Sequence, residues 1–176
     1  MKKVVSVVKS LLISIWVLVA ITTTILLISY NDYSVSEIGS YSIFIVDSER
    51  LEPLYNKNDI LIVKKVAENK YSVGDNAFFY LDNAADSIFI NHGEITKIDE
   101  VEHGEDAYYF GDDAVSYSRL LGPEKETKVC HGWGLLLSIL ESRWGFMFFI
   151  IFPTIFAVVY EIYSIVEEIK SEDDEE

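Results

Sequence analysis

An uncharged, apolar run of 22 residues near the start of the chain, from Ser10 to Asn31, constrains the fold more than any other feature. A helix of about 20 residues crosses the hydrocarbon core of a bilayer, so the run predicts a membrane-spanning helix over 10–31. Lysines precede this run and no Lys or Arg follows it before Arg50. This bias predicts that residues 1–9 are cytoplasmic and that the following segment lies outside the cytoplasm. The run exceeds the roughly 7–15 apolar residues of a cleavable signal peptide, which favours an uncleaved anchor.

A second uncharged run of 17 residues extends from Trp144 to Tyr160 and is at the short end for a membrane span. Trp and Tyr at its two ends are typical of membrane interfaces. Pro153 predicts a kink, which a membrane helix tolerates when a neighbour satisfies the freed carbonyl. A buried core helix is the alternative, but the run is apolar on every face. We therefore predict a second spanning helix over 144–166.

The net charge of −15 is concentrated at the end of the chain, where residues 161–176 contain eight acidic residues and only one lysine. Such a segment is expected to be solvated, and we predict an acidic cytoplasmic tail over 167–176. The chain has no basic surface that would neutralise phosphates, so we predict no nucleic-acid partner. One cysteine and three histidines lack metal-ligand spacing, and no glycine-rich phosphate loop occurs. We accordingly predict no metal and no cofactor.

Residues 32–143 contain short runs rich in Ile, Val, Phe and Tyr, separated by polar breaks that are typical of turns. No stretch has convincing helical periodicity, and no internal repeat occurs. The pattern predicts a mainly β fold: a small β-domain between two transmembrane helices. The predicted strands are Tyr41–Val46, Ile60–Val66, Ala77–Leu81, Ile88–Ile90 continuing through Glu94–Ile98, Ala107–Phe110 and Thr127–Cys130.

Five short motifs occur in a fixed order in and around these strands. They are Val-Asp-Ser-Glu-Arg-Leu-Glu-Pro at 46–53, Asn-Asp before an apolar strand at 58–63, Tyr-Ser-Val-Gly-Asp at 71–75, Ile-Asn-His at 90–92 and Phe-Gly-Asp-Asp at 110–113. With the two spans, this order resembles the type I signal peptidases of the endoplasmic-reticulum, archaeal and SipW-like kind. The resemblance implies a small β-domain held at the outer membrane surface. It also implies the family's activity, which removes signal peptides from exported proteins after small residues.

The resemblance also implies roles for individual residues. His92 matches the general base, Asp112 the acidic partner of that base, and Ser48 a hydroxyl that helps to line the oxyanion hole. The family's nucleophilic serine, however, falls on Arg50, which is always cationic and is neither a nucleophile nor a general base. A cation near His92 would also disfavour the imidazolium form that the base must adopt.

Two further positions depart from the family pattern. Ser118 stands where the family has a second aspartate, and Gly93 stands where an arginine usually follows the histidine. Arg50 is therefore interpreted as one sign of a relaxed active site.

Each of these residues also has a structural interpretation. His92 can be a histidine on a half-buried strand, and Asp112 can be a turn residue. Arg50 can form an ion pair with Asp112 or Glu52. Ser48 lies two strand positions from Arg50, roughly 6–7 Å along a strand, so it could attack only after a two-residue slip of the segment.

Cys130 and His131 are adjacent and resemble a nucleophile and its base. Neighbouring residues in a strand point to opposite faces, however, so they are poorly placed to form a hydrogen-bonded pair. We interpret Cys130 as a small buried residue.

The sequence thus predicts a two-pass cell-membrane protein of the signal peptidase I family, with its main domain outside and both termini in the cytoplasm. Its peptidase activity is expected to be lost or greatly reduced. The predicted partners are membrane lipid and, in a secretion role, a signal peptide, a translocon component or an active homologue. One alternative is an active serine-type peptidase that uses an unrecognised nucleophile such as Ser48. Another is a two-span protein whose β-domain has diverged to an unrelated interaction, with the tail docking a basic partner.

Overall fold

The computed structural model describes residues 2–47, 49–82, 88–100 and 104–173. Ser48, one of the predicted site residues, lies outside the described residues. The chain divides into two units, which are considered separately: Thr24–Leu135, and a helical unit of Met1–Thr23 with Leu136–Glu176.

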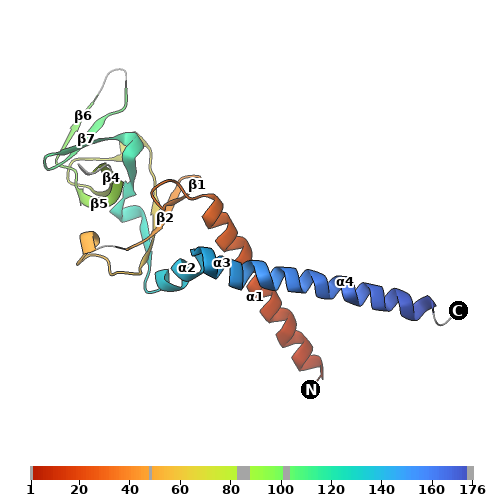
Figure 1. Ribbon diagram of the computed structural model, residues 1–176. Helices are drawn as coiled ribbons and strands as arrows, with labels where there is room; N and C mark the ends of the chain where they lie inside the picture. Colours follow the sequence, from red (N-terminus) through yellow and green to blue (C-terminus); the bar gives the residue numbers. More distant parts are fainter. Residues whose placement is uncertain (1, 48, 83–87, 101–103, 174–176) are drawn as a thin grey trace. The chain divides into compact units, whose positions relative to one another are not determined.

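The unit 24–135 is built from three small antiparallel sheets (Figure 1). The first has the order β1-β2-β3-β10 and consists of Ser36–Ile38, Tyr41–Ile45, Ile60–Lys64 and Thr127–Cys130. The second has the order β5-β4-β9 and consists of Ile88–Glu94, Asn76–Asp82 and Leu120–Pro123. The third has the order β6-β7-β8 and consists of Lys97–Asp99, Ala107–Phe110 and Asp113–Ser116. The prediction of a mainly β domain is confirmed.

Strand β4 is buried on both faces and joins two hydrophobic clusters. Phe78 and Tyr80 point into a cluster with residues of the first sheet, whereas Ala77 and Phe79 point into a cluster with residues of the third sheet. This alternation follows from the period of two in a β-strand. Complete burial of a Phe side chain contributes about 1.5–3 kcal/mol, so β4 holds both halves of the core together.

The second sheet lies close to the first at Gly122 in β9. A Cβ atom at this position would lie 2.5 Å from the backbone oxygen of Lys64 and 2.7 Å from a methyl carbon of Val63. Only glycine therefore fits where β9 crosses β3, and this contact fixes the position of the segment that follows β9.

Six of the predicted strand regions contain strands, but the structure adds β1, β8 and β9 and separates β6 from β5. The added strands have three or four residues, and β9 has the sequence Leu-Leu-Gly-Pro, which resembles a turn. The prediction of no helix within 32–143 was wrong, because α2 covers Gly134–Glu141. Its sequence, Gly-Leu-Leu-Leu-Ser-Ile-Leu-Glu, is too uniformly apolar to show a helical period.

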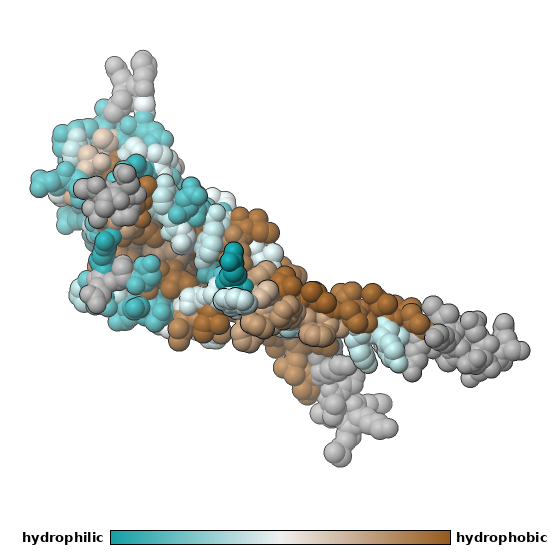
Figure 2. Space-filling model, viewed as in Figure 1, coloured by the Kyte–Doolittle hydropathy of each residue, from teal (hydrophilic) through white to brown (hydrophobic). Residues whose placement is uncertain are grey.

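Among the described residues, two helices are long and apolar enough to cross a membrane, over Ser10–Ile28 and Arg143–Tyr163. The first is most of α1 (Lys2–Ile28). The second comprises α3 (Arg143–Phe146), a π-helical turn over Met147–Ile151 and the first part of α4 (Phe152–Asp173). Their side chains are mainly apolar and exposed, which gives the hydrophobic surface along these helices in Figure 2.

The π-helical turn ends two residues before Pro153. Proline has no backbone N–H, so the carbonyl of Phe149, four residues earlier, loses its usual helical donor. The indole Nε1 of Trp16 in α1 donates a hydrogen bond to this carbonyl oxygen at 3.1 Å. In addition, the hydroxyl of Thr154 donates to the carbonyl of Ile150 at 2.6 Å. The polar groups freed around Pro153 are thus satisfied inside the helical unit, as a membrane helix requires.

Candidate functional site

Arg50 lies in a single 3₁₀ turn, η1 (Glu49–Leu51), that follows β2. Its guanidinium carbon lies 3.7 Å from the ring centroid of Phe89 in β5, a cation–π contact. Arg50 takes part in none of the ion pairs between described residues, so the structure gives it an aromatic partner in place of Asp112 or Glu52. The side chain of Arg50 is exposed, and the cation therefore remains partly hydrated.

A cavity of about 280 Å³ opens beside Arg50. It is bounded by the end of β2 and the segment after it (44–47), by the first three residues of β5 (88–90), by Arg50 with Leu51, and by Tyr33 with Ser34. Strand β5 is the edge of its sheet and pairs only with β4 among the described strands. The cavity therefore joins a strand edge without a second described partner strand to a mixed wall of apolar side chains, one cation and the carboxylate of Asp47.

His92 lies further along the same strand, on the face that it shares with Ile88 and Ile90. Its side chain is only 9% exposed. The imidazole packs against the ring of Phe78 at a centroid distance of 4.9 Å and against the ring of Tyr55 at 6.2 Å. The structural interpretation of His92 as a buried strand residue is consistent with this packing.

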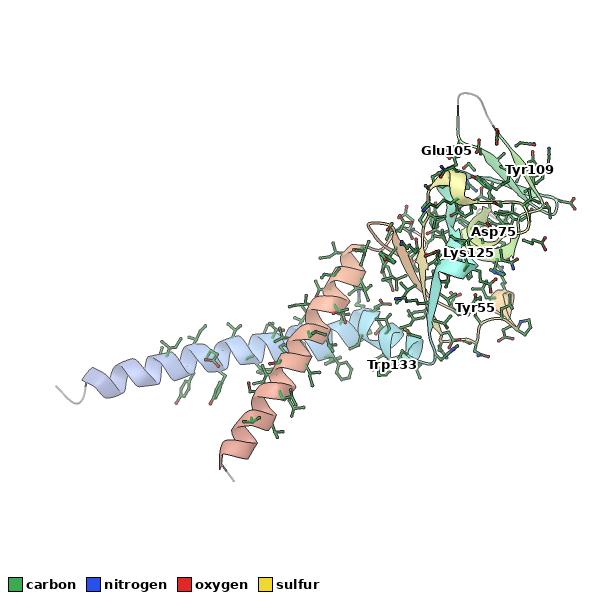
Figure 3. All side chains as sticks on the ribbon, turned by 180° about the vertical axis from the view of Figure 1, so that it is seen from behind. Tyr55, Asp75, Glu105, Tyr109, Lys125 and Trp133 are labelled. Atoms are coloured by element: carbon green, nitrogen blue, oxygen red, sulfur yellow. The ribbon has the colours of Figure 1, made fainter. Side chains whose placement is uncertain are left out.

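The carboxylate beside His92 is that of Glu124, in the 3₁₀ turn η4 (Glu124–Glu126) directly after β9. The Nε2 atom of His92 lies 3.4 Å from Oε2 of Glu124, although the alignment is too poor for a hydrogen bond and Nε2 has no other partner among the described residues. The hydroxyl of Tyr55, which Figure 3 labels, donates to the other carboxylate oxygen at 3.2 Å. Burial, and then the charge of Glu124, raise the pKa of Tyr55 to about 12.

Glu124 was not predicted as a site residue. It belongs to the run Glu-Lys-Glu-Thr-Lys at 124–128, whose alternating charges resemble a solvated loop. Strand β9 pairs with β4 so that Pro123 lies opposite Ala77, and β4 also pairs with β5, which contains His92. These two pairings bring Glu124, the residue after Pro123, near His92. Because the pairing of β9 with β4 is long-range, no local sequence signal marks Glu124.

Asp112 lies at the exposed turn between β7 and β8. Phe110, two residues before Asp112, packs over Gly93, where a Cβ would lie 3.4 Å from the Phe110 ring. Phe110 therefore lies on the face of β5 opposite to the His92 side chain. Among the described residues, no hydrogen bond or ion pair joins Asp112 to His92. The role of Asp112 as partner of the base stays a prediction.

The two other departures from the family motifs do not face the His92 side chain. Gly93 lies against the stacked rings of Phe79 and Phe110, whose centroids are 3.8 Å apart, on the opposite face of β5. The backbone N–H of Ser118 donates to Glu105 at 3.0 Å, and its hydroxyl pairs with that of Ser116 at 2.8 Å. Within the part of the chain that the structure describes, no Ser, Thr or Cys side chain contacts His92 as a nucleophile would.

A second histidine–carboxylate pair joins Asp59, before β3, to His131, after β10. The buried Asp59 carboxylate lies 3.0 Å from Nδ1 of His131 and accepts hydrogen bonds from the backbone N–H groups of Asn56 and Gly132, each at 3.1 Å. Burial alone would raise the pKa of Asp59, but these hydrogen bonds, led by that from His131, lower the pKa below its ordinary value. The pair fastens the two loops together.

Among the described residues, no group of three or more His, Cys, Asp and Glu side chains is arranged to hold a metal ion. No protein-family model matches the chain, and no curated protein matches it significantly.

Proposed function

We propose that this chain is a membrane-anchored relative of the type I signal peptidases whose β-domain binds an extended peptide without cleaving it. The observation that carries the proposal is the position of Arg50. It lines a cavity beside a free strand edge, at the point of the sequence motif where the family has its nucleophile. A signal peptide of an exported protein is the proposed ligand, and the two long apolar helices are the proposed membrane anchor.

The surroundings of His92 support the absence of cleavage. Hydrolysis by the family's chemistry needs a hydroxyl within about 3 Å of the base. The imidazole of His92 is instead enclosed by the rings of Phe78 and Tyr55, with Glu124 at its Nε2 atom. Arg50 is turned toward Phe89 and makes no described contact with His92. The side chain of His92, at the position of the base, is therefore not in contact with residue 50, at the position of the nucleophile.

The edge of β5 supports peptide binding. An exposed edge offers unpaired backbone N–H and C=O groups, and an extended peptide can pair with them while its alternate side chains enter the adjacent cavity. Residues 88–90 supply both that edge and one wall of the cavity. Main-chain pairing is tolerant of sequence, which suits a ligand class as varied as signal peptides.

Photo-crosslinking tests the binding site. A photoreactive amino acid at Asp47, which is exposed and lines the cavity, should form an adduct with a signal-peptide substrate added to the detergent-solubilised full chain. The matched control is the same amino acid at Val73, which is 61% exposed and lies outside the cavity. Equal adduct yields at both positions, or none at Asp47, would contradict peptide binding at this cavity.

A cleavage assay tests the absence of catalysis. Neither the native chain nor the Arg50→Ser variant should release mature product from the same substrate, because no described contact joins residue 50 to His92. Product from the native chain that disappears in Ser48→Ala would support the active alternative and overturn the proposal. Product from Arg50→Ser alone would show that only the nucleophile is missing, and would contradict our account of His92.

A further inference from the structure

A second cavity, of about 430 Å³, is lined by four lysines although the chain as a whole carries a net charge of −15. They are Lys64, Lys65, Lys70 and Lys125, and Glu126 is the one acidic residue of the lining. The rest of the lining comes from Val66 and Ala67. The cavity shares no lining residue with the one beside Arg50.

Tertiary structure assembles this cluster from three separate segments. Lys64 is the last residue of β3 and Lys65 follows it, whereas Lys70 ends the 3₁₀ turn η2 (Glu68–Lys70). Lys125 belongs to η4, which the antiparallel pairing of β10 with β3 brings beside the end of β3. Four cations that come together from segments up to 61 positions apart repel one another, so this arrangement costs stability unless an anion offsets it.

The acidic residues nearby neutralise only part of this charge. Lys125 is paired with Asp75 at 2.9 Å, a pair that Figure 3 labels. Lys64 and Lys70 form no ion pair with any described residue. These two ammonium groups, of Lys64 and Lys70, are therefore available to an anion in the cavity.

Lys65 is the most enclosed of the four. Its Nζ donates to the backbone oxygen of Ser118 at 3.3 Å and lies 4.6 Å from the ring centroid of Tyr117. Burial lowers the pKa of Lys65, and the more distant charges of Glu37 and Glu105 do not fully compensate. Ser118 and Tyr117 do not line the lysine-lined cavity, so the ammonium group of Lys65 already has partners outside it.

We propose that this cavity binds a phosphate group. A compact, multiply charged anion matches the two unpaired lysines of the lining, Lys64 and Lys70, and lysine binds phosphate as a point charge without strict geometry. An acidic peptide fits less well, because β3 already pairs with β2 and β10 and offers no free edge, and the apolar lining is limited to Val66 and Ala67. The source of the phosphate is either a free ion or the headgroup of an anionic lipid.

Ligand-detected ³¹P NMR on the detergent-solubilised full chain tests the proposal, with inorganic phosphate as the probe. We expect saturable broadening of the phosphate signal, and the Lys64→Gln/Lys70→Gln variant should weaken the apparent affinity by about tenfold or more, since each lost cation removes a charge-assisted contact. The matched control is Lys57→Gln/Lys97→Gln, which removes two lysines outside the cavity and should bind as the native chain does. Thermal unfolding of each variant shows whether it is folded.

Native mass spectrometry from mixed micelles that contain phosphatidylglycerol distinguishes the two sources. Lipid retained by the native chain and lost in Lys64→Gln/Lys70→Gln would identify a lipid headgroup, and its absence beside saturable phosphate binding would identify a free ion. The proposal is overturned if broadening is absent, if acetate at equal ionic strength competes equally well, or if both double variants behave alike. It is also overturned if an acidic peptide binds the lysines while phosphate does not.

Discussion

Glu124 contacts two buried side chains at once, since its two carboxylate oxygens lie next to the imidazole of His92 and the hydroxyl of Tyr55. Tyr55 is 7% exposed and the His92 side chain 9% exposed. If Glu124 were removed, water could therefore reach these two polar groups only in part. A buried polar group that loses its partner bears the full cost of its desolvation.

The variant Glu124→Ala should accordingly lower the free energy of unfolding by about 1–3 kcal/mol, because Tyr55 loses its acceptor and His92 its nearby carboxylate. The measurement is denaturation of the full chain in detergent, followed by intrinsic fluorescence. Glu126→Ala removes the exposed carboxylate two residues away and should change stability by no more than about 0.5 kcal/mol. Equal effects of the two substitutions would show that Glu124 does not support the buried pair.

The lowered pKa of Asp59 predicts that the folded protein loses stability at acid pH. This pKa is lowered in the folded state, so the contribution of Asp59 to stability is present above the unfolded pKa of about 3.9 and is lost as the pH falls through the lower folded value. The Tm of the native chain should therefore fall more steeply below about pH 4 than that of Asp59→Asn. The matched control is Asp112→Asn, which makes the same substitution at an exposed turn outside this pair. Parallel Tm profiles for native chain and Asp59→Asn would contradict this account.

Among the elements, the second apolar helix shows how a long apolar helix can contain a proline. Pro153 removes a donor, the turn before it widens to a π-helix, and Trp16 of α1 supplies the replacement donor to Phe149. An unsatisfied carbonyl in hydrocarbon would cost several kcal/mol. The bond also explains a tryptophan within the first apolar helix, because an indole N–H away from water needs an acceptor.

Trp16→Phe keeps an aromatic ring and removes the donor, so it should weaken association of the two helices by about 0.6–2 kcal/mol. Unfolding in mixed micelles of increasing dodecyl sulfate content measures this loss. In a Pro153→Ala background the backbone N–H of residue 153 can donate to Phe149 itself, and Trp16→Phe should then have a smaller effect. An equal effect in both backgrounds would show that the tryptophan acts by packing alone.

For the whole molecule, the lysines before the first span predict that the β-domain faces away from the cytoplasm. In a Cys130→Ala background, a cysteine at Val73 should react with a membrane-impermeant maleimide added to intact cells. A cysteine at Val7, at the start of α1, should react only after the membrane is opened. Both positions are well exposed, at 61% and 68%, so accessibility within the protein does not limit the reaction. The reverse labelling pattern would contradict the predicted orientation.

The sequence predicted the surroundings of the site residues less well than it predicted the fold. The motifs drew attention to Arg50, His92 and Asp112, and the structure gives each of them different surroundings: a cavity with Phe89, a buried cluster and an exposed turn. The carboxylate that does accompany His92, Glu124, lies 32 positions further along the chain. Its neighbours in sequence are charged, so nothing local distinguishes it from a solvated loop.

The sequence by itself determined the two apolar helices, the mainly β character of the intervening domain and the presence of a cation at position 50. These follow from hydropathy, from residue period and from residue identity, which are local properties. Tertiary structure alone decided the pairing of β9 with β4, the position of Glu124, the lysine-lined cavity and the contact of Trp16 with Phe149. Each of these depends on groups that are distant along the chain, and their proximity arises only when sheets and helices pack.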